Sequence, residues 1–219
     1  CKMLANFGVG YNHINVSAAQ KAGVSVSNTP GAVTDATADI AMSLILMSCR
    51  RLGEGERMVR ASAWDGWHPT QLLGMHIGGK TLGIIGMGRI GKAIARRAAA
   101  GFGMNVIFYN RSTVDAPEHG TQMPEISQVL GASDVVVLAV PATPQTHRLM
   151  NAERFAQMQP HAHLINIARG DVVDEAALVD ALQSGQIAGA GLDVYEREPI
   201  VSEALLQMEN VALLPHLGT

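Results

Sequence analysis

The chain has 219 residues, of which 47% are hydrophobic and 4% aromatic, and its formal net charge is -3. That length can bury a substantial core, as one large domain or as one domain with part of another. The slightly acidic balance gives no reason to expect nucleic acid or an anionic membrane as a partner. The longest apolar run, residues 40–47, is far shorter than the ~20 residues of a membrane span. No signal-peptide pattern opens the chain, and its two cysteines are typical of reduced thiols, so we expect a cytoplasmic protein.

Residues 1–30 differ in pattern from the rest of the chain. KMLANFGVGYNHIN (2–15) predicts a strand that runs into a glycine-rich loop, and GVSVSNTPG (23–31) predicts a short strand that ends in a proline turn. These pieces are too few to make a sheet of their own. We therefore interpret residues 1–30 as the C-terminal remnant of another domain and residues 31–219 as a second domain.

The second domain opens with a long predicted helix at residues 34–52. Its start is rich in Asp and Thr and its end is cationic, which suits the helix dipole. Residues 62–79 contain Trp64, Trp67 and four glycines, and they predict a loop.

After residue 80, short apolar strands alternate with helical segments. Strands are predicted at 81–86, 105–110, 134–140, 162–168, 187–194 and 210–215, and helices at 90–102, 125–133 and 174–185. Asp174 and Gly185 are the expected N-cap and C-cap of the last helix. This alternation predicts an α/β fold of the Rossmann type, a doubly wound and mostly parallel sheet covered on both faces.

The sequence GMGRIG (86–91) is a G-x-G-x-x-G between a predicted strand and a predicted helix. The motif alone is weak, because glycines also cluster in ordinary tight turns. In this context Gly86 permits the turn, Gly88 lets the backbone approach a pyrophosphate and Gly91 lets helix and strand pack closely. Arg89 and Ile90 open the helix, whose free N–H groups favour phosphate. We therefore expect a dinucleotide site.

The end of the second strand of this unit indicates which dinucleotide is preferred. NAD-selective sites carry an acid there, ~20 residues after the glycines. Here the segment YNRST (109–113) offers Asn110, Arg111 and Ser112 and no acid. A guanidinium and a hydroxyl suit a 2′-phosphate, so we predict NADP(H), with NAD(H) possible if Arg111 is simply a solvated loop residue.

Polar residues follow three predicted strands: Arg169, Asp193 and His216. Ligands of open α/β sheets bind at the carboxyl ends of the strands, the edge that also carries GMGRIG. Glu198 lies five residues past Asp193 and could reach a neighbouring strand end. Any one of these residues alone could be structural, but the set predicts a site.

The segments GMGRIG, NIARGDVVDEAALVDAL, GAGLDVYEREP and LLPHLG resemble the D-isomer-specific 2-hydroxyacid dehydrogenases. The helix at 34–52, the WDGW loop (64–67) and NRS (110–112) most resemble the NADP-preferring glyoxylate/hydroxypyruvate reductases. Members of the family carry a flavodoxin-like substrate domain and a helix after the histidine. Neither is present here, so we expect the chain to be a piece of a longer protein.

The resemblance implies a role for each polar residue. His216 would be the general acid that protonates the carbonyl oxygen, with Glu198 as its partner. Arg169 would hold the carboxylate of the 2-oxo acid through paired hydrogen bonds. Asp193 would bond the nicotinamide carboxamide. The remaining implied contacts are the N–H groups of Val9 and Gly10 with the substrate, and Val140, Pro141, Thr146, Ile167 and Ala168 with the cofactor.

Trp67 has two open interpretations, since its loop could reach the partner subunit's active site or could be buried at a dimer contact. The other histidines are scattered and predict no metal site. We expect a homodimer built around the helix at 34–52 that reduces glyoxylate or hydroxypyruvate with NADPH. The alternatives are an NAD-linked D-2-hydroxyacid dehydrogenase with another substrate, such as D-lactate, and a dinucleotide-sensing protein similar to corepressors.

Overall fold

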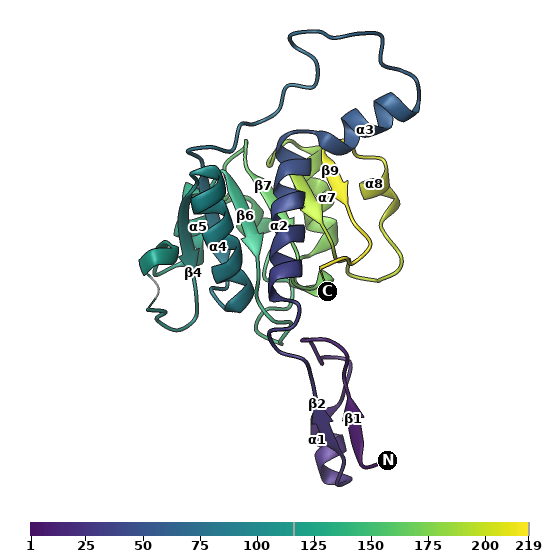
Figure 1. Ribbon diagram of the computed structural model, residues 1–219, viewed down its shortest axis with the longest axis vertical. Coiled ribbons are helices and arrows are strands. Elements are labelled where there is room, and N and C mark those ends of the chain that lie inside the picture. Colours follow the sequence, from purple (N-terminus) through teal and green to yellow (C-terminus); the bar gives the residue numbers. More distant parts are fainter. Residues whose placement is uncertain (116, 219) are drawn as a thin grey trace.

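The N-terminal residues form a small unit beside the main α/β unit (Figure 1). The computed structural model describes residues 1–115 and 117–218. Strand β1 (Met3–Ala5) and strand β2 (Ser25–Ser27) pair in parallel, and helix α1 (Val16–Lys21) connects them. The expectation that these pieces make no sheet of their own is therefore wrong, because they form a two-stranded sheet. The sequence analysis did not predict α1, which the Asn15 side chain caps by accepting a bond from the Ala18 N–H.

The main unit is built on seven parallel strands in the order β5-β4-β3-β6-β7-β8-β9. Their bounds are β3 Thr81–Ile85, β4 Asn105–Tyr109, β5 Thr121–Gln122, β6 Val135–Leu138, β7 His163–Asn166, β8 Gly189–Leu192 and β9 Val211–Leu213. The chain runs outward from β3 to β5 and then returns to the other side of β3 at β6, so the strand order reverses between β3 and β6. This reversal is the switch point at which doubly wound sheets bind ligands. The predicted Rossmann fold is confirmed.

Helices cover both faces of the sheet (Figure 1). Helix α2 (Thr34–Cys49) and helix α4 (Arg89–Phe102) share one apolar cluster with the sheet. The opposite cluster is covered by α5 Ile126–Ala132, α6 Ala152–Phe155, α7 Glu175–Gln183 and α8 Glu203–Leu206. Strands β6, β7 and β8 are buried along their whole length, which explains their near-continuous apolar sequences. Two 3-10 turns, Pro117–His119 and Gly170–Val172, complete the elements.

The predicted helix at 34–52 is in fact two helices. Helix α2 ends at Cys49, and α3 (Leu52–Arg60) follows a left-handed Arg51 with φ 55°. The break is stabilised from both sides, because the Met75 N–H donates to the Cys49 carbonyl and the Arg51 guanidinium binds the Glu54 carboxylate. Arg51 is therefore the N-cap of the second helix and does not belong to the first.

The C-terminal end of helix α7 differs slightly from the prediction. Asp174 is its N-cap, as predicted, and accepts a bond from the Ala177 N–H at 3.3 Å. The C-cap is Ser184, and Gly185 follows it with φ 72°. The glycine thus stands one position later than expected, in the left-handed conformation that glycine adopts without strain.

Candidate active site

The glycine turn lies between β3 and α4 and has the geometry of a pyrophosphate site. Gly86 has φ 103°, and a Cβ at this position would lie 2.7 Å from the Ala139 carbonyl oxygen. A Cβ at Gly91 would overlap the Gly86 carbonyl. By contrast, no described heavy atom lies within 4 Å of a Cβ built at Gly88, so protein packing does not demand glycine there. Close approach of a ligand does account for it, and the residues fit a dinucleotide.

Helix α4 presents its N-terminus to the same place. Gly88 is the N-cap and makes no side-chain capping bond, and Arg89 and Ile90 form the first turn. Arg89 is exposed, whereas Ile90 packs against the core beneath the turn. The unsatisfied N–H groups and the helix dipole favour an anion at this end.

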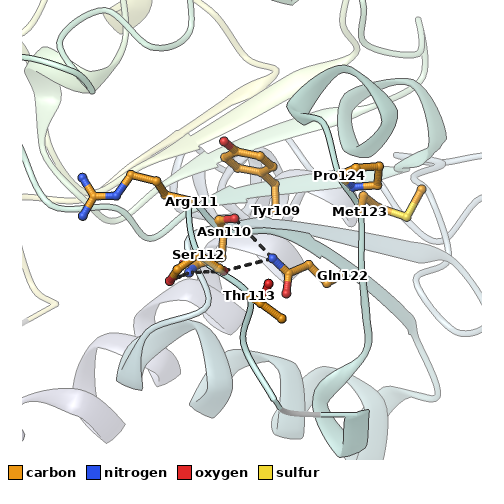
Figure 2. Close-up of a pocket in the computed structure, with 8 residues that line it drawn as sticks. All are labelled: Tyr109, Asn110, Arg111, Ser112, Thr113, Gln122, Met123 and Pro124. Carbon is orange, nitrogen blue, oxygen red and sulfur yellow. Dashed lines mark hydrogen bonds between the residues drawn. The ribbon is translucent and has the colours of Figure 1, made fainter.

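The carboxyl end of β4 borders a cavity of about 420 Å³ that residues 109–113 and 122–124 line (Figure 2). Asn110, Arg111 and Ser112 all lie in its wall, and their predicted role as a 2′-phosphate site stays a prediction. The Asn110 Oδ1 accepts a bond from the Met87 N–H at 3.2 Å, which ties this wall to the glycine turn. None of the residues in the wall is acidic, and the Arg111 side chain extends away from Gln122 (Figure 2).

The other predicted cofactor contacts follow β6 and β7. The Val140 side chain lies beside Gly86, 2.9 Å from a Cβ built there. The Thr146 hydroxyl is used within its own turn, since it donates to the Pro141 carbonyl at 2.6 Å and accepts from the Thr143 N–H at 2.8 Å. Ile167 and Ala168 are buried at the end of β7. Val140 thus borders the glycine turn, and the contacts of all these residues with a cofactor stay a prediction.

The glycine-rich loop after β1 is held with its carbonyl groups turned to one side. The Asn6 amide donates to the carbonyls of Gly8 and Gly10, at 2.9 and 3.0 Å, and the Asn28 amide donates to the Val9 carbonyl at 2.9 Å. In a trans peptide the next N–H points away from the carbonyl. The N–H groups of Val9 and Gly10 therefore face away from these asparagines, and within the described residues no group accepts a bond from them. Such a loop can bind a carboxylate.

Arg169 meets this loop. A Cβ at Gly10 would overlap the Arg169 guanidinium, so the two lie in contact. The Asn166 amide shapes the segment that carries Arg169, because it donates to the Arg169 carbonyl at 2.9 Å and accepts from the Ala168 N–H at 3.0 Å. The structure thus joins the predicted carboxylate loop and the predicted carboxylate-binding arginine, which are far apart in the sequence.

His216 and Glu198 form the expected pair. The His216 Nδ1 lies 2.9 Å from the Glu198 Oε2, and the other carboxylate oxygen accepts from the Tyr195 N–H at 3.1 Å. The Tyr195 hydroxyl donates to the Leu214 carbonyl at 2.8 Å, which links the two segments that carry the pair. Burial, with the nearby Asp193 and other carboxylates, raises the pKa of Tyr195 to about 12, so its hydroxyl stays protonated. Because Nδ1 is engaged, the Nε2 of His216 is the nitrogen left to act on a substrate.

Asp193 holds the backbone around His216. His216 has φ 55°, a left-handed conformation that is unusual for a residue with a side chain. Its N–H donates to the Asp193 carbonyl at 2.9 Å, and the two carboxylate oxygens accept from the N–H groups of Leu217 and Gly218, at 2.7 and 2.8 Å. Asp193 is buried and therefore fixes the loop from within. The sequence analysis predicted a nicotinamide contact for Asp193 and missed this role.

Trp67 belongs to a loop at the opposite end of the sheet from these residues (Figure 1). It belongs to the long loop before β3, which Figure 1 shows beyond the end of α2, and its side chain is 78% exposed. The distance between the two ends separates Trp67 from the candidate active site of its own chain. A role at a partner's site stays a prediction.

Residues that sequence reasoning missed act through the backbone. Asn6, Asn28, Asn166 and Tyr195 hold the loops that carry the predicted groups. Asparagines beside glycine-rich or strand-end segments are the signal that could have found them. In the described part of the chain, no three His, Cys, Asp or Glu side chains are grouped as metal ligands. No helix formed by these residues has both the length and the apolar character of a membrane span.

Comparison with protein families gives one clear match. The profile described as "D-isomer specific 2-hydroxyacid dehydrogenase, NAD binding domain" matches residues 42–218. A glyoxylate reductase from Pyrococcus horikoshii is 48% identical over 224 residues, which cover 100% of this chain and 67% of that protein. The chain thus spans about two thirds of this relative.

Solved structures agree with the sequence comparison. The NADPH-dependent glyoxylate/hydroxypyruvate reductase of Sinorhizobium meliloti, in complex with NADP and malonate, is 43% identical with a TM-score of 0.92. The alignment covers 99% of this chain and 67% of that one. A glyoxylate reductase from Paecilomyes thermophila is 41% identical with a TM-score of 0.91, over 100% of this chain and 66% of that one.

Proposed function

This chain belongs to the D-isomer specific 2-hydroxyacid dehydrogenase family of NAD(P)-dependent oxidoreductases, and we propose that the complete protein reduces glyoxylate or hydroxypyruvate with NADPH. One observation carries the proposal: the His216–Glu198 pair, Arg169 and the loop at Val9 and Gly10 accompany the glycine turn at one edge of the sheet. The product would be the D-2-hydroxy acid.

The substrate carboxylate is bound by Arg169 and by the N–H groups of Val9 and Gly10. A planar guanidinium and two backbone donors fix both the position and the direction of a 2-oxo acid. The bound nicotinamide supplies a hydride to the carbonyl carbon. Since Glu198 holds the Nδ1 of His216, the Nε2 donates a proton to the carbonyl oxygen. Glu198 keeps the imidazole ring in place before and after the transfer.

The cofactor is held by the residues at the switch point of the sheet. Gly86, Gly88 and Gly91 with the first turn of α4 receive the pyrophosphate, and the turn with Asn110, Arg111 and Ser112 receives the 2′-phosphate. Val140, Pro141, Thr146, Ile167 and Ala168 border the dinucleotide, and Asp193 can also accept a bond from the carboxamide. The lack of an acid in the wall of the cavity in Figure 2 supports NADPH over NADH.

We also propose a homodimer. One face of α2 packs on its own sheet, and helix α3 with the loop after it adds an exposed apolar surface next to α2. That surface comprises Leu52, Val59, Trp64, Trp67 and Leu73. Light scattering of the complete protein would reveal twice the chain mass, and a monomer would contradict this part of the proposal. The cytoplasmic location stays a prediction.

Steady-state kinetics test the proposed reaction. The complete protein is assayed with NADPH and with NADH against glyoxylate, hydroxypyruvate and pyruvate. We expect the highest kcat/KM for NADPH with glyoxylate or hydroxypyruvate. Equal or better use of NADH would refute the cofactor preference, and a better rate with pyruvate would favour a D-lactate type of enzyme. If no 2-oxo acid is reduced although the dinucleotide binds, the sensing protein is the better interpretation.

A further inference from the structure

The turn at residues 110–114 depends on a side chain from another strand. Gln122 lies on β5, the edge strand, and its backbone is fixed by pairing with Phe108 of β4. Its side chain crosses to the turn and makes three hydrogen bonds, of which Figure 2 draws those to Asn110 and Ser112. The amide nitrogen donates to the carbonyls of Asn110 and Ser112, at 3.2 and 3.1 Å, and the amide oxygen accepts from the Val114 N–H at 2.9 Å. One side-chain amide group therefore bonds the backbone at the start, the middle and the end of the turn.

These bonds determine which way the backbone donors of the turn point. The carbonyls of Asn110 and Ser112 are directed to Gln122, so the next N–H groups, those of Arg111 and Thr113, point away from it. In the described part of the chain no group accepts a bond from either N–H, and none pairs with the Arg111 guanidinium. Two backbone donors and one guanidinium thus remain available to an anion.

Asn110 prepares the Ser112 hydroxyl in the same way. The Asn110 amide donates to the Ser112 Oγ at 3.2 Å and to the Ser112 carbonyl at 3.0 Å. Because the hydroxyl oxygen accepts this bond, its hydrogen is free to be donated elsewhere. The turn therefore displays donors, which suit a phosphate monoester better than the neutral 2′-hydroxyl of NADH.

We propose that Gln122 is a specificity-determining positioning residue, which holds the turn at 110–114 in the shape that binds the 2′-phosphate of NADPH. The inference rests on the proposed use of NADPH. A turn that is ordered before the cofactor arrives loses less conformational freedom on binding, so the phosphate is bound more tightly. Among the residues that the structure describes, Gln122 makes no bond to the glycine turn at residues 86–91, where the pyrophosphate would bind. The loss of Gln122 should therefore weaken NADPH far more than NADH.

The variant Gln122→Met tests this, since it keeps the length of the side chain and removes all three bonds. Kinetics with glyoxylate should give a KM for NADPH about tenfold higher, with kcat and the KM for NADH nearly unchanged. Gln159→Met is the matched control, because the Gln159 amide also donates to a backbone carbonyl, that of Gly131, away from this cavity. Its KM for both cofactors should equal that of the wild type.

A second variant and a double variant separate positioning from general damage. Gln122→Glu keeps the acceptor for the Val114 N–H but loses both donors and adds a negative charge, so it should disfavour NADPH more strongly than Gln122→Met. In an Arg111→Ala background, Gln122→Met should raise the KM for NADPH by less than it does alone, since both act through the same phosphate. Equal losses for NADPH and NADH, or no loss for either, would overturn the inference.

The outcome also separates this inference from the proposed function. If the wild type uses NADH as well as NADPH, the proposed cofactor preference fails before any variant is made. If the wild type prefers NADPH and both Gln122 variants keep that preference, the assignment of Gln122 alone fails. Binding of 2′-phospho-AMP and of AMP, measured by calorimetry, gives a readout that does not depend on turnover. Only the phosphorylated ligand should bind more weakly to the variants.

Discussion

The two edges of the main sheet each carry a histidine bonded to a carboxylate, but their surroundings differ. At the carboxyl edge the His216 Nδ1 lies 2.9 Å from Glu198, and at the amino edge the His161 Nε2 lies 2.8 Å from Asp134. Asp134 is also bonded by the Thr81 N–H and paired with Lys80. Burial opposes its ionisation, yet these partners together lower the pKa of Asp134 below its ordinary value. The Asp134 carboxylate therefore holds the amino ends of β3, β6 and β7 together.

The two histidine–carboxylate pairs differ in the groups that surround them. At the carboxyl edge, the backbone of His216 is strained and is held by Asp193, and Arg169 and the glycine turn lie at the same edge. At the amino edge the turn at Gly78 and Gly79 is closed by backbone bonds, since the Gly79 N–H donates to the Gly103 carbonyl and the Lys80 N–H to the Ile77 carbonyl. A histidine–carboxylate pair therefore indicates catalysis only through its neighbours. This difference can be tested by comparing each substitution at the carboxyl edge with a control substitution elsewhere in the chain.

The largest difference is expected between the two histidines. His216→Ala removes the proposed proton donor and should lower kcat about a thousandfold while NADPH still binds. His161→Ala removes the histidine of the amino-edge pair and should leave kcat unchanged. Steady-state kinetics and fluorescence titration with NADPH measure both quantities. A wild-type rate for His216→Ala would eliminate it as the acid.

Charge reversal in the 110–114 turn should have the next largest effect. Arg111→Asp places an acid where a 2′-hydroxyl can bond it and a 2′-phosphate is repelled, so the ratio of kcat/KM for NADPH to that for NADH should fall at least about tenfold. Arg50→Asp, at an exposed position at the end of α2, serves as a control for the change in net charge. An unchanged ratio in Arg111→Asp would make Arg111 a solvated loop residue.

Substitution of Asn6, which shapes the substrate loop, should change the KM for glyoxylate more than kcat. Asn6→Ala frees the carbonyls of Gly8 and Gly10, so the N–H groups of the loop lose their fixed direction. We expect the KM for glyoxylate to rise about tenfold with the KM for NADPH unchanged. Asn105→Ala is the matched control, since that amide donates to the Gly79 carbonyl at the amino edge. Equal kinetics for both variants would show that the loop needs no such support.

The smallest effect is expected for His163, which should change how the free energy of unfolding depends on pH. Burial, with His161 adding to it, lowers the pKa of His163 from 6.5 to about 4. The unfolded chain then binds a proton that the folded chain does not, so the free energy of unfolding is highest above pH 6.5 and falls as the pH drops toward 4. The slope should approach about 1.4 kcal/mol per pH unit. His163→Gln should flatten this slope in urea unfolding series, and an identical slope would refute the assignment.

Sequence reasoning located the parts of the protein that regular patterns encode. Strands β3, β4 and β6 to β9, the glycine turn and the strand-end residues follow from apolar periodicity and from the rule that parallel strands end at one edge. The family resemblance was confirmed by the comparisons. The role of each site residue stays a prediction.

What the sequence did not predict depends on single contacts between distant segments. The break at Arg51 arises from the bond between Met75 and the end of α2, and the short elements α1, α6, α8 and β5 have too few residues for a period to emerge. The bonds of Asn6 and Gln122 join residues whose closeness only the folded chain creates. Hence the sequence indicated the candidate site residues and not the residues that hold their backbone in place.

A crystal structure of the complete protein with NADP and oxamate would test the central claim most directly. The carboxylate of oxamate should lie against Arg169 and the N–H groups of Val9 and Gly10, its amide oxygen should meet the Nε2 of His216, and the 2′-phosphate should contact Arg111 and Ser112. An oxamate bound away from the His216–Glu198 pair would contradict the assignment of this edge as the active site.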